Sequence, residues 1–116
     1  MTLLKIQSYE SFDYSKYGLL TRLDFQRRFL ETDESLVDLE LELANHAQPT
    51  GNVLIITAKR VSDLKIGNLN SGETILLMIR DISSYGLEFA RYRVKDEEAN
   101  VLEFNCCDFD FSLRSQ

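Results

Sequence analysis

The residues that could carry nucleophilic or acid–base chemistry are few, and they form no recognisable catalytic motif. His46 is the only histidine, so a mechanism that needs a general base near neutral pH would depend on it. It lies in the polar segment 45–52 beside the only proline, Pro49, which is typical of an exposed connection. The sequence contains no G-x-S-x-G, G-x-x-x-x-G-K-S/T or G-x-G-x-x-G pattern. We therefore predict a protein that is not an enzyme and uses no cofactor.

Carboxylates offer a second kind of chemistry, the binding of a hard cation through oxygen ligands. Asp108 and Asp110 are two residues apart, so on a strand they would share one face, and Asp81 could join them. Because these aspartates alternate with phenylalanines, the pattern also fits an acidic, solvated strand face over an aromatic core. A small-ligand or divalent-metal-binding β domain that uses Asp81, Asp108 and Asp110 stays as the alternative function.

An acidic stripe is the sharpest pattern in the chain. Leucines and a valine alternate strictly with Asp38, Glu40 and Glu42 over residues 37–43, which predicts an antiparallel strand with one face in the core. Three like charges along the other face repel one another, and a basic protein partner would relieve that repulsion. The alternative is a plainly solvated strand face. We predict a partner-binding surface made of Asp38, Glu40 and Glu42, extended by Asp96, Glu97 and Glu98.

The cysteines and the apolar runs favour a cytoplasmic protein. Cys106 and Cys107 are adjacent, so a structural disulfide between them would be strained, and two thiols alone make a poor zinc site. The longest apolar runs, such as Ile75–Ile79, fall far short of the roughly 20 residues that span a bilayer. The first ten residues hold no apolar stretch of signal-peptide length.

Composition narrows the classes of partner. The chain has 116 residues, 13 of them Lys or Arg and 19 Asp or Glu, which gives a net charge of −6, and 44% are hydrophobic. That length and hydrophobic fraction indicate one folded domain rather than a disordered or membrane-spanning chain. The acidic balance argues against nucleic-acid binding, which needs a basic face, and favours a basic protein partner.

The elements that would position these residues are mostly strands. Residues 19–29 alternate with period two, although a helix is an alternative reading of the same segment. The polar residues 31–35 read as a hairpin loop, and Val53–Ala58 reads as a strand covered on both faces. Residues 87–95 and 101–113 form a predicted hairpin in which we expect Phe89 and one tyrosine to pack in the core.

Two slips of the alternation predict irregular backbone. One lies near Ser62 and Asp63, and the other lies between Cys106 and Asp108, where the buried parity changes from even to odd numbers. With turn signals between the runs, the pattern predicts a mainly β protein, its antiparallel sheet folded as a sandwich or curled half-barrel. We expect residues 18–116 to form this single domain and residues 1–17 to form an arm of uncertain structure that could include a short helix.

The second half of the chain, about residues 53–111, resembles a known group of proteins. The segments that carry the resemblance are VSDLKI (61–66), IRDISS (79–84) and FNCCDF (104–109). In their order and spacing they are similar to small bacterial immunity proteins of polymorphic toxin systems, with the fiftieth immunity family as the nearest. This resemblance implies a cytoplasmic binding protein that caps a toxin domain. It carries no catalytic motif over to any residue.

Together these features predict a non-enzymatic, cytoplasmic protein-binding domain that occludes a basic toxin partner through an acidic face. We expect it to bind neither nucleic acid nor membrane. Self-association through exposed strand edges is a third hypothesis.

Overall fold

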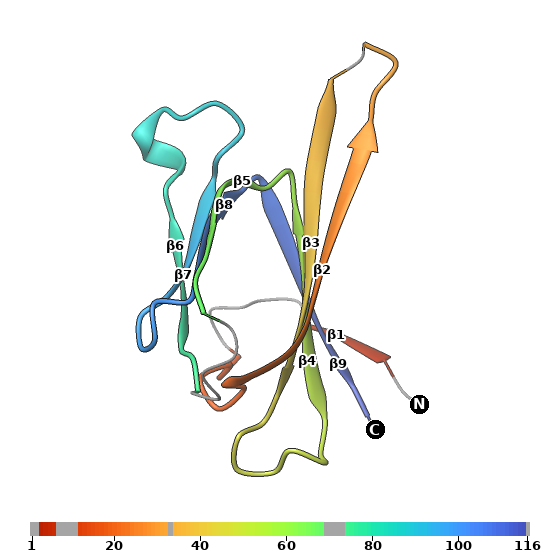
Figure 1. Ribbon diagram of the computed structural model, residues 1–116, viewed down its shortest axis with the longest axis vertical. Coiled ribbons are helices and arrows are strands. Elements are labelled where there is room, and N and C mark those ends of the chain that lie inside the picture. Colours follow the sequence, from red (N-terminus) through yellow and green to blue (C-terminus); the bar gives the residue numbers. More distant parts are fainter. Residues whose placement is uncertain (1–2, 7–11, 33, 69–73, 116) are drawn as a thin grey trace.

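Two antiparallel sheets face each other in the computed structural model, which describes residues 3–6, 12–32, 34–68 and 74–115 (Figure 1). The first sheet has five strands in the order β1-β9-β4-β3-β2. Their bounds are β1 Leu3–Ile6, β2 Leu19–Phe29, β3 Ser35–Ala44, β4 Val53–Lys59 and β9 Asp108–Arg114. The second sheet has four strands in the order β5-β8-β7-β6. Their bounds are β5 Ser62–Ile66, β6 Leu77–Asp81, β7 Tyr92–Asp96 and β8 Leu102–Cys106, and a 3-10 turn, η1, covers Ser83–Tyr85. The predicted β sandwich is confirmed.

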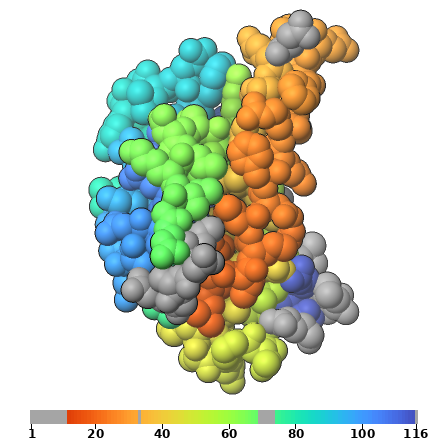
Figure 2. Space-filling model, viewed as in Figure 1, coloured from red at the N-terminus to blue at the C-terminus, as the bar shows by residue number. Residues whose placement is uncertain are grey.

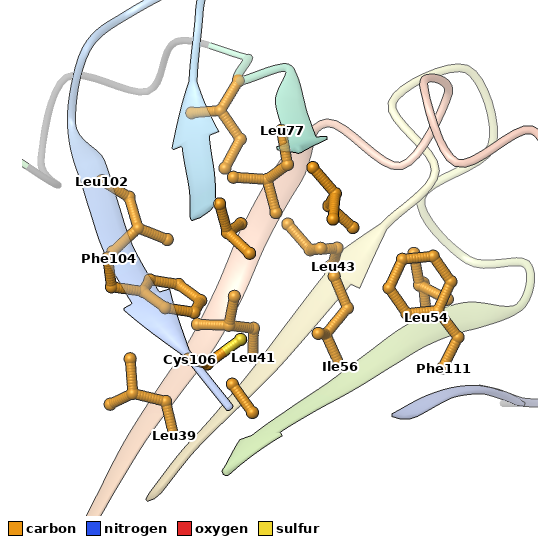
Figure 3. Close-up of a cluster of buried hydrophobic side chains, with 14 of the residues drawn as sticks. Leu39, Leu41, Leu43, Leu54, Ile56, Leu77, Leu102, Phe104, Cys106 and Phe111 are labelled. Carbon is orange, nitrogen blue, oxygen red and sulfur yellow. The ribbon is translucent and has the colours of Figure 1, made fainter. Parts of the chain in front are cut away.

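The core lies between the sheets and follows directly from the alternation. Leu39, Leu41 and Leu43 of β3 point inward and are almost completely buried, as the period-two pattern requires. Figure 3 shows them packed against side chains of both sheets, and the largest partners are Phe104 and Phe111. The outer face of the first sheet, defined as the face turned away from the second sheet, therefore carries Asp38, Glu40 and Glu42 of the same strand.

The chain passes from one sheet to the other at two corners. Between β4 and β5, the N–H of Val61 donates to the carbonyl of Val37 at 2.6 Å. Arg60 adopts a left-handed φ of 55° at this corner. Between β8 and β9, the N–H of Cys107 donates to the carbonyl of Lys59 at 2.9 Å. Each corner is therefore held by a hydrogen bond to a strand of the first sheet.

Most of the predicted strands and irregular positions are confirmed, with three differences besides the start of β7 at Tyr92, which leaves residues 87–91 of the predicted arm outside any strand. Residues 19–29 form strand β2, so the helical alternative is wrong for this segment. The irregularity at Ser62 and Asp63 is confirmed by a register shift between β5 and β8 and by a φ of 53° at Asp63. The phase change at Cys107 lies where it was predicted, but it marks the passage between sheets rather than a bulge within one strand.

The third difference concerns the N-terminal arm. Residues 3–6 form a strand that pairs with β9 at the edge of the first sheet. A helix is therefore excluded for these four residues, while residues 1–2, 7–11 and 69–73 lie outside the described part of the chain.

The β2–β3 hairpin extends past the rest of the sandwich. Its tip is closed by a hydrogen bond from the N–H of Leu30 to the carbonyl of Glu34 at 2.8 Å. Figure 1 shows the outer end of this hairpin rising beyond β4 and β9, with the connection between β6 and β7 at the same end of the molecule. Side chains near the hairpin tip therefore lack the cover that the second sheet gives to the rest of the core.

Candidate protein-binding site

The acidic stripe lies on the outer face of the first sheet, as predicted, but two of its three carboxylates are buried. Asp38 is 3% exposed and Glu42 is 8% exposed, whereas Glu40 is partly exposed. Buried carboxylates need counter-charges or hydrogen-bond donors, so the neighbouring strands decide what this stripe can do.

Asp38 is held by groups from three parts of the sheet. Its Oδ2 accepts from Arg28 Nε at 2.8 Å, and its Oδ1 accepts from Arg28 Nη2 at 3.2 Å and from the backbone N–H of Arg60 at 3.0 Å. Lys59 Nζ lies 3.6 Å from Oδ2. Burial alone would raise the pKa of Asp38, but the hydrogen bonds from Arg28 and Arg60 and the charges of Arg28 and Lys59 outweigh it, and the pKa is lowered.

Glu40 and Glu42 share the cations of β2 and β9. Arg22 contacts the carboxylates of Asp24 and Glu40, and its Nε lies 3.3 Å from Glu42 Oε2. Arg114 pairs with the other oxygen of Glu42. The hydrogen bond to Glu40, more than any other effect, raises the pKa of Arg22. The repulsion that the sequence suggested is therefore relieved within the sheet, by Arg22 and Arg28 of β2, Lys59 of β4 and Arg114 of β9.

The outer face nevertheless stays acidic on β2, β3, β4 and β9. The register aligns Asp24, Glu40, Thr57 and Asp110 in one row across these strands, and it places Asp108 opposite Lys59. On the outer face of these four strands carboxylates outnumber cations. The carboxylates are Asp24, Asp38, Glu40, Glu42, Asp108 and Asp110, and the cations are Arg22, Arg28, Lys59 and Arg114.

The second predicted acidic segment belongs to the other sheet. Asp96 ends β7 and is fully buried, so its carboxylate does not reach the surface. It accepts hydrogen bonds from four backbone N–H groups, those of Leu76, Glu98, Ala99 and Val101. Burial would raise the pKa of Asp96, but these donors outweigh it and lower the pKa. Glu97 lies beside it, where it pairs with Arg80 at 3.5 Å, and Glu98 is exposed.

The six predicted residues therefore do not form one surface. The stripe faces outward from the first sheet, whereas Glu97 and Glu98 lie in the β7–β8 turn of the second sheet. A partner-binding role stays a prediction for the exposed members of the set. Asp96 has a role that is evident from its contacts, the fixing of this turn.

The three aspartates of the metal alternative are not brought together. Asp81 ends β6 in the second sheet, and its Oδ1 accepts from the N–H of Ser83 at 2.9 Å and from its hydroxyl at 2.6 Å. Asp108 and Asp110 lie on the outer face of the first sheet. Across the described residues, no three His, Cys, Asp or Glu side chains converge on a position that could hold a metal ion. The geometry therefore does not support that metal site.

The histidine and the buried cysteine lie in different surroundings. His46 is exposed in the β3–β4 connection. Cys106 is buried in the core, and this burial raises the pKa of its thiol to about 12, which keeps it protonated and unreactive.

Exposed apolar side chains gather where the hairpin projects. Among the described residues, all the large exposed hydrophobics except Ile66 and Met78 belong to β2, to the hairpin tip or to the β6–β7 connection. Figure 2 shows these two segments as prominences at the same end of the molecule. We call this set the apolar end. It consists of Phe25, Phe29, Leu30, Tyr85, Leu87 and Phe89.

Phe89 is the clearest correction to the sequence-based expectations. It was expected in the core, yet it is 49% exposed, while Tyr92 is half-buried and packs edge-on against Phe109 at 4.9 Å between ring centroids. Phe89 adopts a φ of 63°, which turns the chain away from the sheet before β7 begins. Such a left-handed φ is uncommon for a bulky residue.

A groove of about 460 Å³ separates the two prominences. One wall is the inner side of the hairpin, with Arg27 and Val37, and the other is formed by Arg60 of the β4–β5 corner and by Phe89. The guanidinium carbon of Arg60 lies 3.4 Å from the centroid of the Phe89 ring, a cation–π contact that fixes the position of this ring. Sequence patterning missed this site because it does not reveal that the second sheet ends before the hairpin does.

One of the three comparisons with known proteins gives a match. In the described part of the chain, no helix is long and apolar enough to span a membrane. Neither the curated proteins nor the solved structures include a match. The family model described as immunity protein PIM8 matches residues 1–112, which extends the resemblance predicted for residues 53–111 to nearly the whole chain, although under a different family label from the fiftieth. The chain therefore belongs to the PIM8 family of immunity proteins.

Proposed function

We propose that this protein protects a cell by binding a toxin domain of a polymorphic toxin system and covering its active surface. Membership of an immunity protein family supports an immunity-type protein-binding role. In this proposal the protein acts in the cytoplasm, carries out no catalysis and binds as a steric and electrostatic cap.

The observation that carries the proposal is the apolar end. Large apolar side chains gathered in exposed positions at one end of a soluble protein are typical of a protein–protein interaction site. Aromatic side chains and arginine are enriched among the residues that dominate protein–protein affinity, and Phe29 is 75% exposed while Phe25 is 51% exposed. A projecting hairpin with aromatic side chains near its tip can enter a cleft on a partner.

The acidic outer face would act together with the apolar end. Because its carboxylates outnumber its cations, it would attract a basic partner over several ångströms and increase the rate of association. Glu40 and Asp110 are the acids that we expect to contribute most, since both lie in the acidic row and neither is buried.

Growth protection tests the proposed function. The chain would be co-expressed with the toxin encoded by the neighbouring gene in a host that this toxin kills, and the two proteins would then be mixed and sized by light scattering. We expect restored growth and a complex of fixed stoichiometry. Full toxicity in the presence of well-expressed, folded protein would contradict the proposal.

Variants distinguish the contribution of the apolar end from that of the acidic outer face. Replacing Phe25 and Phe29 with alanine should abolish protection, whereas Glu40→Lys with Asp110→Lys should slow association and make it less sensitive to salt. Ile66→Ala with Met78→Ala is the matched control, because these side chains are exposed apolar residues outside the apolar end. Loss of protection in the control alone would contradict the assignment of the surface.

A further inference from the structure

The groove of the apolar end contains charges of both signs, and they differ in whether a neighbour already satisfies them. Its cations are Arg27 and Arg60, and its acids are Glu34 and Glu88. Arg27 donates to the hydroxyl of Ser35 at 2.9 Å and lies 5.7 Å from the ring centroid of Phe25. Arg60 lies on Phe89, as described above. Both guanidinium groups are therefore engaged inside the groove.

The two acids have no such partners. Glu34 belongs to the turn of the β2–β3 hairpin and Glu88 to the β6–β7 connection, so they come from the two opposite prominences. Both are exposed, and no cation or hydrogen-bond donor among the described residues contacts either carboxylate. The four charges of the groove sum to zero, and the two carboxylates are the ones that no other described group contacts.

Four of the residues that line the groove between these acids are apolar. Leu36, Val37, Val61 and Phe89 line the groove. An arginine or lysine side chain fits such a lining, because its alkyl stem packs on apolar surface while its charged head stays at the rim.

We infer that this groove binds a basic side chain of the protein partner, an arginine or lysine carried on a segment with apolar neighbours. The head group would lie between Glu34 and Glu88, and the apolar neighbours would contact Phe89 and the hairpin. The inference rests on the proposed function, since it names the chemistry of the toxin segment that this end of the immunity protein recognises.

Three short peptides test the inference without the toxin. Uniformly ¹⁵N-labelled protein would be titrated with Ac-Leu-Arg-Leu-NH₂, with the same peptide carrying Gln in place of Arg, and with the one carrying Glu. We expect saturable shifts of the amide signals of Glu34, Glu88 and Phe89 with the arginine peptide. The glutamine and glutamate peptides should bind at least about threefold more weakly, as expected when one or two exposed charge pairs are lost.

Two isosteric double variants provide the control. Glu34→Gln with Glu88→Gln should weaken binding of the arginine peptide and should remove the preference for arginine over glutamine. Glu97→Gln with Glu98→Gln removes the same charge from the β7–β8 turn and should leave the titration unchanged. Equal binding of the glutamate peptide, or an equal loss in the control variant, would overturn the inference. Signals that shift with protein concentration alone would assign the groove to a second copy and would also overturn it.

The peptide titration and the growth-protection assay can fail independently of each other. A chain that binds the arginine peptide in the groove but gives no protection would support the groove and contradict the toxin-binding role. A chain that protects fully while the groove signals stay unchanged in the titration would contradict the groove alone.

Discussion

The outer face of the first sheet and the apolar end differ in whether their side chains already have partners within the protein. On the outer face, Asp38 and Glu42 are buried and paired with cations of neighbouring strands. At the apolar end, Phe29 and Phe89 are exposed with no sheet above them. The sequence pattern pointed to the first region by its charge, but the second exposes the large apolar side chains that a partner could cover. A conspicuous sequence pattern can therefore mark a structural network, while the binding surface that we propose consists of side chains that the fold leaves uncovered.

Removing Asp96 should have the largest effect, and it should affect folding rather than recognition. Asp96→Ala would leave buried backbone N–H groups of the β7–β8 turn without an acceptor, which we expect to lower the free energy of unfolding by about 4 kcal/mol. Urea denaturation followed by circular dichroism measures this loss. Asp96→Asn keeps one acceptor oxygen and should lose about half as much. An unchanged midpoint in Asp96→Ala would show that this carboxylate does not hold the turn.

Asp38 should come next, because it links the charged face to the groove. Asp38→Ala leaves Arg28 and Lys59 half exposed, so water can solvate them, and we expect a loss of about 2 kcal/mol rather than the larger value of a fully buried pair. The substitution also removes the acceptor of the Arg60 N–H, so the Arg60–Phe89 contact should loosen. Glu40→Gln is the matched control and should change stability by less than about 1 kcal/mol. Equal losses in the two variants would contradict the distinction between buried and exposed acids.

Truncating Phe29 should separate binding from stability. Because its side chain is 75% exposed, Phe29→Ala should change the free energy of unfolding by no more than about 0.5 kcal/mol. If it is a central anchor of the interface, its loss should weaken toxin binding by about 2 kcal/mol, roughly 30-fold in Kd. Calorimetric titration and thermal unfolding of the same variant give the two numbers. A large loss of stability with unchanged affinity would reverse the interpretation.

Acid should weaken the fold through the buried carboxylates. The pKa values of Asp38 and Asp96 are lowered in the folded state. Their contribution is therefore fully present above the unfolded pKa of about 4 and is lost as the pH falls through the lower folded values. The urea midpoint should be flat from about pH 7 to pH 5 and then fall below about pH 4. Asp96→Asn should flatten that fall, and a wild-type midpoint that rises on acidification would contradict the assignment.

The smallest effect is expected for the pair between Arg80 and Glu97, whose side chains are substantially exposed. Glu97→Gln should change the free energy of unfolding by less than about 1 kcal/mol and should leave toxin binding unchanged. A clear loss of affinity would instead restore the β7–β8 turn to the binding surface.

The sequence predicted the sandwich well because its evidence is local. Strict alternation in residues 37–43 fixes which side of β3 is buried, and the slip at Ser62 and Asp63 locates the irregular start of β5. The relation between distant segments was not predictable in the same way. Arg22 and Arg28 were visible on the polar parity of their strand, but only the pairing of β2 with β3 shows that they neutralise the stripe. The exposure of Phe89 depends on where the second sheet ends, and no local pattern records that.

The most direct measurement of the central claim is the Kd of the neighbouring gene's toxin domain for two matched double variants. Phe29→Ala with Phe89→Ala removes two aromatic side chains of the apolar end, and Ile66→Ala with Met78→Ala removes two exposed apolar side chains elsewhere. We predict that the first variant binds at least about 100-fold more weakly than the wild type, whereas the second stays within about threefold. Equal affinities of the two variants, or a larger loss in the second, would contradict the assignment of the apolar end as the toxin-binding surface.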